Sequence, residues 1–282
     1  MLSFVALAFS LATSTSRSAE DERPVENAAK FKLDTKSNKS LPTVYLVGDS
    51  TVRVGTPNQR GWGDELAAFF DTHKVNVVNH AIGGRSSRTF QNEGRWDQSL
   101  AMMQKGDFAI IQFGHNDGGP TNDDSRARGT IKGNGEETEE IDNMLTHQHE
   151  VVHSYGWYIR KYIRDAKAKG VTPIVCSLIP RKTWNDGKVA RASDSYGKWA
   201  REAAVQEGAL FVDLNEIIAQ EYEKIGPEKV EPFFADPHTH TSVEGAKFNA
   251  RCVVAGLKGL PGKPLDRYHS DAGREVPAFS SK

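Results

Sequence analysis

Short apolar runs rich in β-branched residues recur along the middle of the chain and predict buried strands. The first three run into glycine- or asparagine-rich sequence, which is typical of a turn at the end of a strand. The five runs cover residues 43–47, 75–79, 108–113, 172–178 and 210–214.

Between these runs, apolar residues recur with the spacing of helices. The clearest stripe runs through residues 151–166 and stops before Gly170, which suits the left-handed position after a helix. Alternating strands and helices predict a parallel sheet with helices on both faces and a ligand site beyond the carboxyl ends of the strands. The shorter helical patterns cover residues 62–71, 96–105, 194–206 and 243–257.

The two ends of the chain differ from this pattern. Residues 1–19 combine a short apolar run with small polar residues and predict a signal peptide, although no Lys or Arg precedes the run. Residues 20–41 have the composition of a polar linker, and residues 263–282 that of a polar tail. We therefore expect one domain over residues 42–262, in a secreted or periplasmic protein.

The composition limits the classes of partner. The 282 residues include 36 Lys+Arg and 37 Asp+Glu, which disfavours nucleic acid or an anionic membrane surface as the main partner. No apolar run approaches the roughly 20 residues of a membrane-spanning helix. Cys176 and Cys252 cannot staple a chain of this length, so an apolar core must stabilise it. We expect them either as two buried thiols or, in an exported protein, as one disulfide.

Polar residues able to do chemistry follow the predicted strands. Ser50, in Gly48-Asp-Ser-Thr51, lies at a strand-to-helix turn, where it is either a nucleophile or a helix cap. A nucleophilic serine needs a base to take its proton. Gly84 lets a backbone N–H point into a site, and Asn116 adds a side-chain N–H, although plain turns have the same sequence.

The segment Asp236-Pro-His238-Thr-His240 supplies an acid and a base near the C-terminus. An H-x-H pair can also bind zinc, but no third ligand is evident nearby. The chain order Ser…Asp…His serves hydrolases of several folds. These blocks together predict one pocket with a nucleophile, a base, an acid and oxyanion donors.

The four blocks in this order resemble the SGNH (GDSL-type) hydrolase superfamily and, within it, the rhamnogalacturonan acetylesterase family. The resemblance covers about residues 42–260. It rests on the motifs Gly48-Asp-Ser-Thr51, Asn79-x-Ala-x-x-Gly84-Arg-Ser-x-Arg88, Phe113-Gly-His-Asn-Asp117 and His238-Thr-His-Thr-Ser242.

The resemblance implies a flavodoxin-like three-layer α/β/α sandwich with a five-stranded parallel sheet. It also implies a serine esterase that removes acetyl groups from a plant or microbial polysaccharide, without metal or cofactor. Ser50 would be the nucleophile and His240 the general base. The oxyanion hole would consist of the backbone N–H groups of Ser50 and Gly84 and the side chain of Asn116.

One position departs from the pattern of this family. The family's acid stands three residues before the base, and that position is Pro237 here. Asp236 stands four residues before His240 and only two before His238. We assign Asp236 to orient His240, because the His-Thr-Ser-x-x-Gly context follows His240.

A competing motif, His149-Glu150-Val-Val-His153, lies on the long predicted helix. Two histidines four residues apart on a helix share a face and can bind zinc, with Glu150 as the base of a metalloprotease. However, a third metzincin ligand would fall on Ile159, and a zinc protease has no use for the four ordered blocks. The alternative is that the helix packs on the domain, with His149 and His153 solvated or hydrogen-bonded near the site.

Basic and aromatic residues near the strand ends suggest the substrate. Arg85 and Arg88 follow the oxyanion glycine, whereas Arg181 and Trp184 follow the fourth strand. Arginine binds carboxylates in a bidentate manner and an indole suits a sugar face, so an acidic, acetylated polymer such as pectin would use both. The structural alternatives are that the first two arginines hold their loop and that Trp184 packs on the core.

The sequence thus predicts a carboxylic ester hydrolase acting on an acetylated poly- or oligosaccharide. A zinc metalloprotease is one alternative. A non-catalytic carbohydrate-binding protein is another, if Pro237 has displaced the acid.

Overall fold

Each of the five apolar runs forms a strand in the computed structural model, which describes residues 33–280. The strands are all parallel and lie in the order β2-β1-β3-β6-β9. The predicted signal peptide and most of the predicted linker lie outside the described residues. The strands are β1 (Thr43–Gly48), β2 (Asn76–Asn79), β3 (Phe108–Gln112), β6 (Thr172–Cys176) and β9 (Leu210–Val212).

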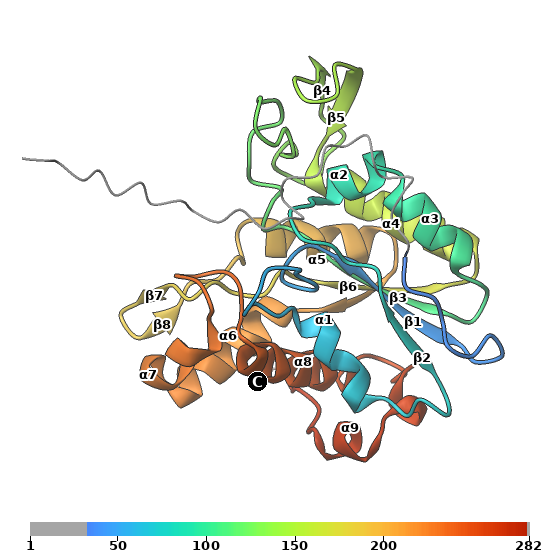
Figure 1. The fold of residues 1–282 in the computed structure, drawn as a ribbon, viewed down its shortest axis with the longest axis vertical. Coiled ribbons are helices and arrows are strands. Elements are labelled where there is room, and N and C mark those ends of the chain that lie inside the picture. The colour runs from blue at the N-terminus through green and yellow to red at the C-terminus, as the bar shows by residue number, and fades with distance from the viewer. Residues whose placement is uncertain (1–32, 281–282) are drawn as a thin grey trace, which may run out of the picture.

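Helices cover both faces of this sheet, as Figure 1 shows. Alternate strand residues point to opposite faces, so Leu46 and Ile110 contribute to one buried cluster and Val47 and Ile111 to the other. The predicted three-layer α/β/α sandwich is confirmed. One layer contains α1 (Trp62–Glu65), η2 (Leu66–Phe69), α6 (Leu214–Ile225) and α8 (Val243–Lys258), and the other α2 (Ser87–Asn92), α3 (Arg95–Met102), α4 (Tyr155–Ala168) and α5 (Tyr196–Gln206).

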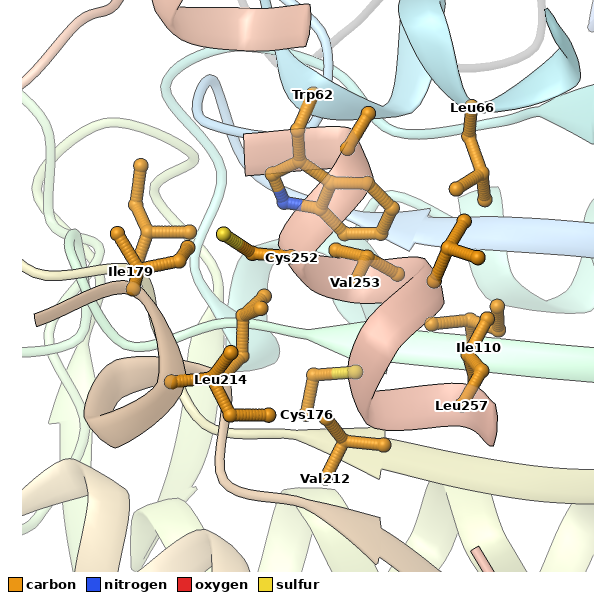
Figure 2. Close-up of a cluster of buried hydrophobic side chains, with 14 of the residues drawn as sticks. Trp62, Leu66, Ile110, Cys176, Ile179, Val212, Leu214, Cys252, Val253 and Leu257 are labelled. Carbon is orange, nitrogen blue, oxygen red and sulfur yellow. The ribbon is translucent and has the colours of Figure 1, made fainter. Parts of the chain in front are cut away.

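The two cysteines lie in the same apolar cluster, shown in Figure 2, and both are free thiols. Burial raises the pKa of Cys176 to about 12 and raises that of Cys252 as well. Both side chains therefore act as small apolar groups in the core, so of the two expected arrangements the structure has the buried thiols and not the disulfide.

The prediction that the H-E-x-x-H motif lies on a helix is wrong. His149–His153 is strand β5, which pairs antiparallel with β4 (Thr138–Asp142) in a hairpin outside the central sheet. The helix starts at Tyr155 because the Ser154 hydroxyl accepts the N–H of Trp157 as an N-cap. Gly170 follows the end of this helix with φ +72°, as expected.

The segment after Gly262, described above as a polar tail, folds against the domain. Leu265, Tyr268 and Val276 are buried in the cluster that α8 also joins, and the N–H of Asp71 donates to the carbonyl of Tyr268. The segment includes η4 (Asp266–Tyr268) and α9 (Asp271–Glu275).

Several short elements have no strong sequence signal. No helix within residues 33–280 is long and apolar enough to cross a membrane. The short elements are β7 (Trp184–Asn185), β8 (Lys188–Val189), α7 (Pro227–Val230) and η3 (Glu231–Phe233).

Candidate active site

Ser50 lies in a tight turn directly after β1. A Cβ on Gly48 would come within 2.5 Å of the Val52 side chain, so only glycine permits this turn. The Asp49 carboxylate accepts the N–H of Thr51 at 2.9 Å and its hydroxyl at 2.7 Å. Ser50 is only 7% exposed, and its position is set by the backbone on both sides.

A chain of buried hydrogen bonds supports this turn from the sheet. The Trp62 indole donates to the Gln112 side-chain oxygen at 2.8 Å, and the Gln112 amide donates to the Thr51 hydroxyl at 2.8 Å. The Thr51 hydroxyl in turn donates to Asp49. Every member is at most 2% exposed, so water cannot replace these bonds. The serine turn is therefore connected to the centre of the fold.

Asp236 organises the loop that carries the two histidines. Its Oδ1 accepts backbone N–H groups from His238 at 3.0 Å, Thr239 at 2.6 Å and His240 at 3.0 Å. Pro237 has no N–H to offer and a fixed φ, which suits the start of such a turn. The four-residue offset between Asp236 and His240 is therefore accommodated by a turn wound around the carboxylate.

The same loop brings the acid, the imidazole and the serine into one line of contacts. Asp236 Oδ2 lies 2.5 Å from His240 Nδ1, and His240 Nε2 lies 2.9 Å from Ser50 Oγ. Partial burial would raise the pKa of Asp236, but the three N–H donors and the imidazole outweigh it and hold that pKa below its usual value. Asp236 is thus an anion facing an imidazole that contacts a serine hydroxyl.

The backbone N–H groups of Ser50 and Gly84 lie at the same edge of the sheet. The Ile82 N–H donates to the carbonyl of Gly48 at 3.1 Å, so Gly84 and Ser50 each lie two residues beyond one shared hydrogen bond. Gly84 has φ +78°, a conformation that favours glycine. Within residues 33–280, no acceptor takes the N–H of Ser50 or of Gly84.

Asn116 joins this edge from the end of β3. Its Nδ2 donates to the carbonyl of Arg85 at 2.8 Å, which fixes the amide next to the Gly84 loop and leaves its second hydrogen for another acceptor. The neighbouring Asp117 is fully buried and accepts both the N–H of Ser87 at 3.0 Å and its hydroxyl at 2.5 Å. Burial raises the pKa of Asp117 to about 7.

Arg85 and Arg88, expected near the substrate, lie inside the protein. The Arg85 Nε contacts both oxygens of Glu93, at 3.2 and 3.1 Å. Arg88 is fully buried and forms a bidentate pair with Glu150, at 2.5 and 2.6 Å. The Arg88 guanidinium also donates to the carbonyls of Thr121 and Gly129. The geometry thus gives both arginines the role of holding loops together.

The second pair of expected substrate residues, Arg181 and Trp184, belongs to the segment after β6. The N–H of Lys182 donates to the carbonyl of His238 at 2.8 Å and ties the segment after β6 to that loop. Arg181 is exposed, and Trp184 on β7 is half-buried against the core.

The residues of the H-E-x-x-H motif are engaged in structural contacts. Glu150 binds Arg88, and the His153 ring stacks on Trp157 with ring centroids 3.7 Å apart. His149 lies on the exposed strand and contacts Asp142 at 3.3 Å. In the described part of the chain, no three His, Cys, Asp or Glu side chains are grouped so as to hold a metal ion.

A pocket of about 490 Å³ opens beside Gly84, between α2, residues 125–128 and the β4–β5 hairpin. Sequence reasoning missed this pocket and its arginines, Arg126 and Arg128, because the hairpin wall has no sequence signal of its own. The only hint is that two arginines closely follow the glycine-rich loop after β3.

The sheet order and the residues at its edge define a class of protein. Ser50 and Asn116 follow β1 and β3, the two strands between which the strand order reverses, which is where ligands bind in such sheets. This fold, with these blocks, is that of the SGNH hydrolases. The chain belongs to the GDSL-like lipase/acylhydrolase family, whose model matches residues 46–248. The predictions of the superfamily and of a carboxylic ester hydrolase are thereby confirmed.

Two relatives whose names state an activity support the same family assignment. A rhamnogalacturonan acetylesterase of Emericella nidulans is 36% identical over 216 residues, which cover 76% of this chain and 84% of that protein. A probable rhamnogalacturonan acetylesterase of Bacillus subtilis, YesY, is 31% identical over 229 residues, which cover 79% of this chain and 94% of that protein. The resemblance to this family seen in the sequence is confirmed.

Solved structures share the fold. The crystal structure of YxiM from Bacillus subtilis matches with a TM-score of 0.62 at 27% identity, covering 77% of this chain and 56% of that one. The present chain thus spans little over half of YxiM. Axe2, an acetylxylan esterase from Geobacillus stearothermophilus, matches with a TM-score of 0.50 at 17% identity, covering 77% of this chain and 94% of that one.

Proposed function

We propose that the protein is a serine esterase that removes acetyl groups from an acidic, pectin-type polysaccharide. The observation that carries this proposal is the line of contacts from Asp236 through His240 to Ser50. Such a line activates a serine, because the imidazole takes the hydroxyl proton while the carboxylate holds the ring in one tautomer.

In the proposed reaction, Ser50 Oγ attacks the acetyl carbonyl carbon and His240 Nε2 takes the hydroxyl proton. The tetrahedral intermediate then collapses, and His240 returns the proton to the sugar oxygen as the sugar leaves. Water attacks the acetyl-serine in the same way, with His240 again as the base, and acetate departs. Asp236 stabilises the imidazolium formed in both halves.

The oxyanion of the intermediate would meet the N–H groups of Ser50 and Gly84 and the second amide hydrogen of Asn116. Donors that are already in place act without reorganisation, and each contributes about 3–4 kcal/mol to stabilising the transition state. That no acceptor in residues 33–280 takes either backbone N–H group supports this assignment.

The names of the relatives supply the substrate class. Both relatives described above carry the name rhamnogalacturonan acetylesterase, which points to an acetylated pectic polymer. On the structural side, Arg181 and Trp184 would flank the sugar beside the histidine loop, whereas Arg85 and Arg88 would organise the oxyanion loop without touching the substrate. The reaction as proposed uses no metal or cofactor.

The test is acetate release from acetylated pectin, acetylated xylan and 4-nitrophenyl acetate by wild type and Ser50→Ala. We expect release by the wild type, highest on the pectic substrate, and a loss of at least 10³-fold in Ser50→Ala with an unchanged melting temperature. Undiminished release by Ser50→Ala would remove Ser50 from the mechanism.

Two further measurements separate the alternatives. The matched pair His240→Ala and His238→Ala identifies the base, and only the first substitution should abolish release. A serine-directed phosphonate should label the wild type, whereas a non-catalytic sugar-binding protein would resist it. Insensitivity to a chelator distinguishes the serine mechanism from the zinc alternative.

A further inference from the structure

Three successive carbonyl groups in the loop after β2 each accept a hydrogen bond from a side chain. Arg85 Nη1 donates to the carbonyl of Gly83 at 3.0 Å. Arg128 Nη1 donates to the carbonyl of Gly84 at 2.9 Å, and Asn116 Nδ2 to that of Arg85 at 2.8 Å. The peptide groups on both sides of Gly84 are therefore held by arginines.

The first of these contacts decides where the N–H of Gly84 points. The carbonyl of Gly83 and the N–H of Gly84 belong to one planar trans peptide group, in which the C=O and N–H bonds point in opposite directions. Because the carbonyl of Gly83 faces the Arg85 guanidinium, the N–H of Gly84 faces the other way. The proposed oxyanion donor is thus directed by the partner of the carbonyl behind it.

The backbone of the two glycines does not hold this peptide group in one orientation. A half-turn of the group changes only the ψ of Gly83 and the φ of Gly84, and glycine tolerates either sign of φ at little cost. The φ of +78° at Gly84 is therefore one of several accessible values. The half-turn would place a carbonyl oxygen where the oxyanion forms and turn the donor away. A side-chain contact must select the productive orientation.

The Arg85 guanidinium is itself held in place. Its Nε contacts both oxygens of Glu93, which ends α2 and also accepts the Nε of Arg95. Arg85 is 6% and Glu93 9% exposed, so water competes little for these bonds. The planar fork of an arginine can meet the carboxylate and the carbonyl of Gly83 at the same time, which the single ammonium group of a lysine does poorly.

We propose that Arg85 and Arg128 are positioning residues that preset the oxyanion hole by holding the peptide groups on either side of Gly84. Arg85 selects the orientation in which the N–H of Gly84 faces the reaction centre, and Arg128 fixes the next peptide group along the chain. Both residues act through the backbone. This proposal rests on the esterase function proposed above.

Arg85→Lys tests the first contact, because it keeps a positive charge beside Glu93 while weakening the hold on the carbonyl of Gly83. The substrate is 4-nitrophenyl acetate, which has no sugar, so contacts to a sugar cannot contribute. We expect kcat and kcat/KM to fall together by about 10- to 100-fold, with KM near the wild-type value. This split is the signature of an interaction that acts only in the transition state.

Arg191→Lys is the matched control. Arg191 Nη1 also donates to the carbonyl of the residue two positions before it, Val189, at 2.7 Å, and its Nε pairs with Glu216 at 3.1 Å. This substitution should leave kcat at the wild-type level. An equal effect of the two substitutions, or a change in Arg85→Lys confined to KM, would overturn the proposal.

Arg128 provides a second, less buried site for the test. Arg128→Met removes every donor and should lower kcat about 10-fold, again with KM unchanged. Arg128→Lys should recover most of this loss, because one ammonium group is enough for one carbonyl. Full activity in Arg128→Met, or no recovery in Arg128→Lys, would overturn the role of Arg128.

A structural measurement separates this proposal from the esterase function. Crystal structures of the wild type and of Arg85→Lys are compared at the peptide group between Gly83 and Gly84. We expect a single orientation in the wild type, and a flipped or mixed orientation in the variant. The same single orientation in both would overturn the role of Arg85, and this result needs no catalysis. The esterase function is decided separately, by acetate release from Ser50→Ala.

Discussion

Residues 236–240 and the strand β5 each carry two histidines and a carboxylate, but the carboxylates have different partners. Asp236 accepts three backbone N–H groups and faces His240, which reaches Ser50. Glu150 instead faces the buried guanidinium of Arg88. The backbone turn around Asp236 orients the imidazole of His240. Glu150 instead connects the β4–β5 hairpin to α2 through Arg88. The partners of the carboxylate, rather than the spacing of the histidines, separate a candidate catalytic segment from a structural one.

Asp236→Asn is expected to have the largest effect in this comparison, and this effect is on activity. The asparagine oxygen can still accept the backbone N–H groups, but its amide cannot stabilise an imidazolium or select the same tautomer. We expect kcat on 4-nitrophenyl acetate to fall roughly 10³-fold with little change in melting temperature.

Asp123 provides the matched control for this substitution. Its Oδ1 also accepts three backbone N–H groups, from Ser125, Arg126 and Ala127, but it has no histidine partner. Asp123→Asn should therefore leave kcat on 4-nitrophenyl acetate near the wild-type level. Equal losses in the two variants would mean that Asp236 only shapes its turn.

The strands and the site blocks could be predicted because their signals are local in the chain. A β-branched run such as residues 43–47, and the Gly-Asp-Ser turn after it, can each be recognised from a few neighbouring residues. The pairing of Asp236 with His240 was expected from the His-Thr-Ser-x-x-Gly context after His240, and the two side chains are in contact.

The rest of the site depends on contacts between distant residues. The partner of Arg88 is Glu150, 62 positions away, and a pairing over that distance cannot be recognised from local sequence. Only one residue of β4 is buried, so the strand lacks the apolar alternation that marks a half-buried strand. Because the hairpin was not predicted, the sequence analysis also missed that the H-E-x-x-H motif lies on a strand and that residues 143–151 line the pocket beside Gly84.

Asp117 is a third carboxylate, and its titration sharpens the comparison because it accepts hydrogen bonds from the N–H and the hydroxyl of Ser87, which are neutral donors. Burial raises its pKa from 3.8 to about 7. A raised pKa means that the folded state holds the proton more tightly, so this stabilising contribution is complete below pH 3.8 and is lost as the pH rises to about 7. At about 1.4 kcal/mol per pKa unit, the loss reaches about 4 kcal/mol.

Asp117→Asn keeps an oxygen for Ser87 and removes the titration. The free energy of unfolding of this variant, minus that of wild type, should therefore increase between pH 4 and pH 7.5. Urea unfolding at four pH values in this range measures the difference, and every other titrating group cancels in it. A difference that does not vary with pH would show that Asp117 titrates in the folded protein as it does in the unfolded chain.

The smallest of these effects is expected from Glu150→Gln, and it should appear in stability rather than in chemistry. Burial alone would raise the pKa of Glu150, but Arg88 and the neighbouring Asn143 amide hold it below its usual value, so the pair is ionised. Removing the anion leaves the fully buried Arg88 charge unpaired, which costs about 3 kcal/mol of unfolding free energy. Glu139→Gln, on the exposed face of the partner strand β4, is the matched control and should change the stability by less than about 0.5 kcal/mol.

Turnover of 4-nitrophenyl acetate by folded Glu150→Gln should stay within about 10-fold of wild type, because its side chain meets neither Ser50 nor His240. A fall in kcat as large as that of Asp236→Asn, with unchanged stability, would instead give β5 a part in the chemistry and dissolve the distinction between the two segments.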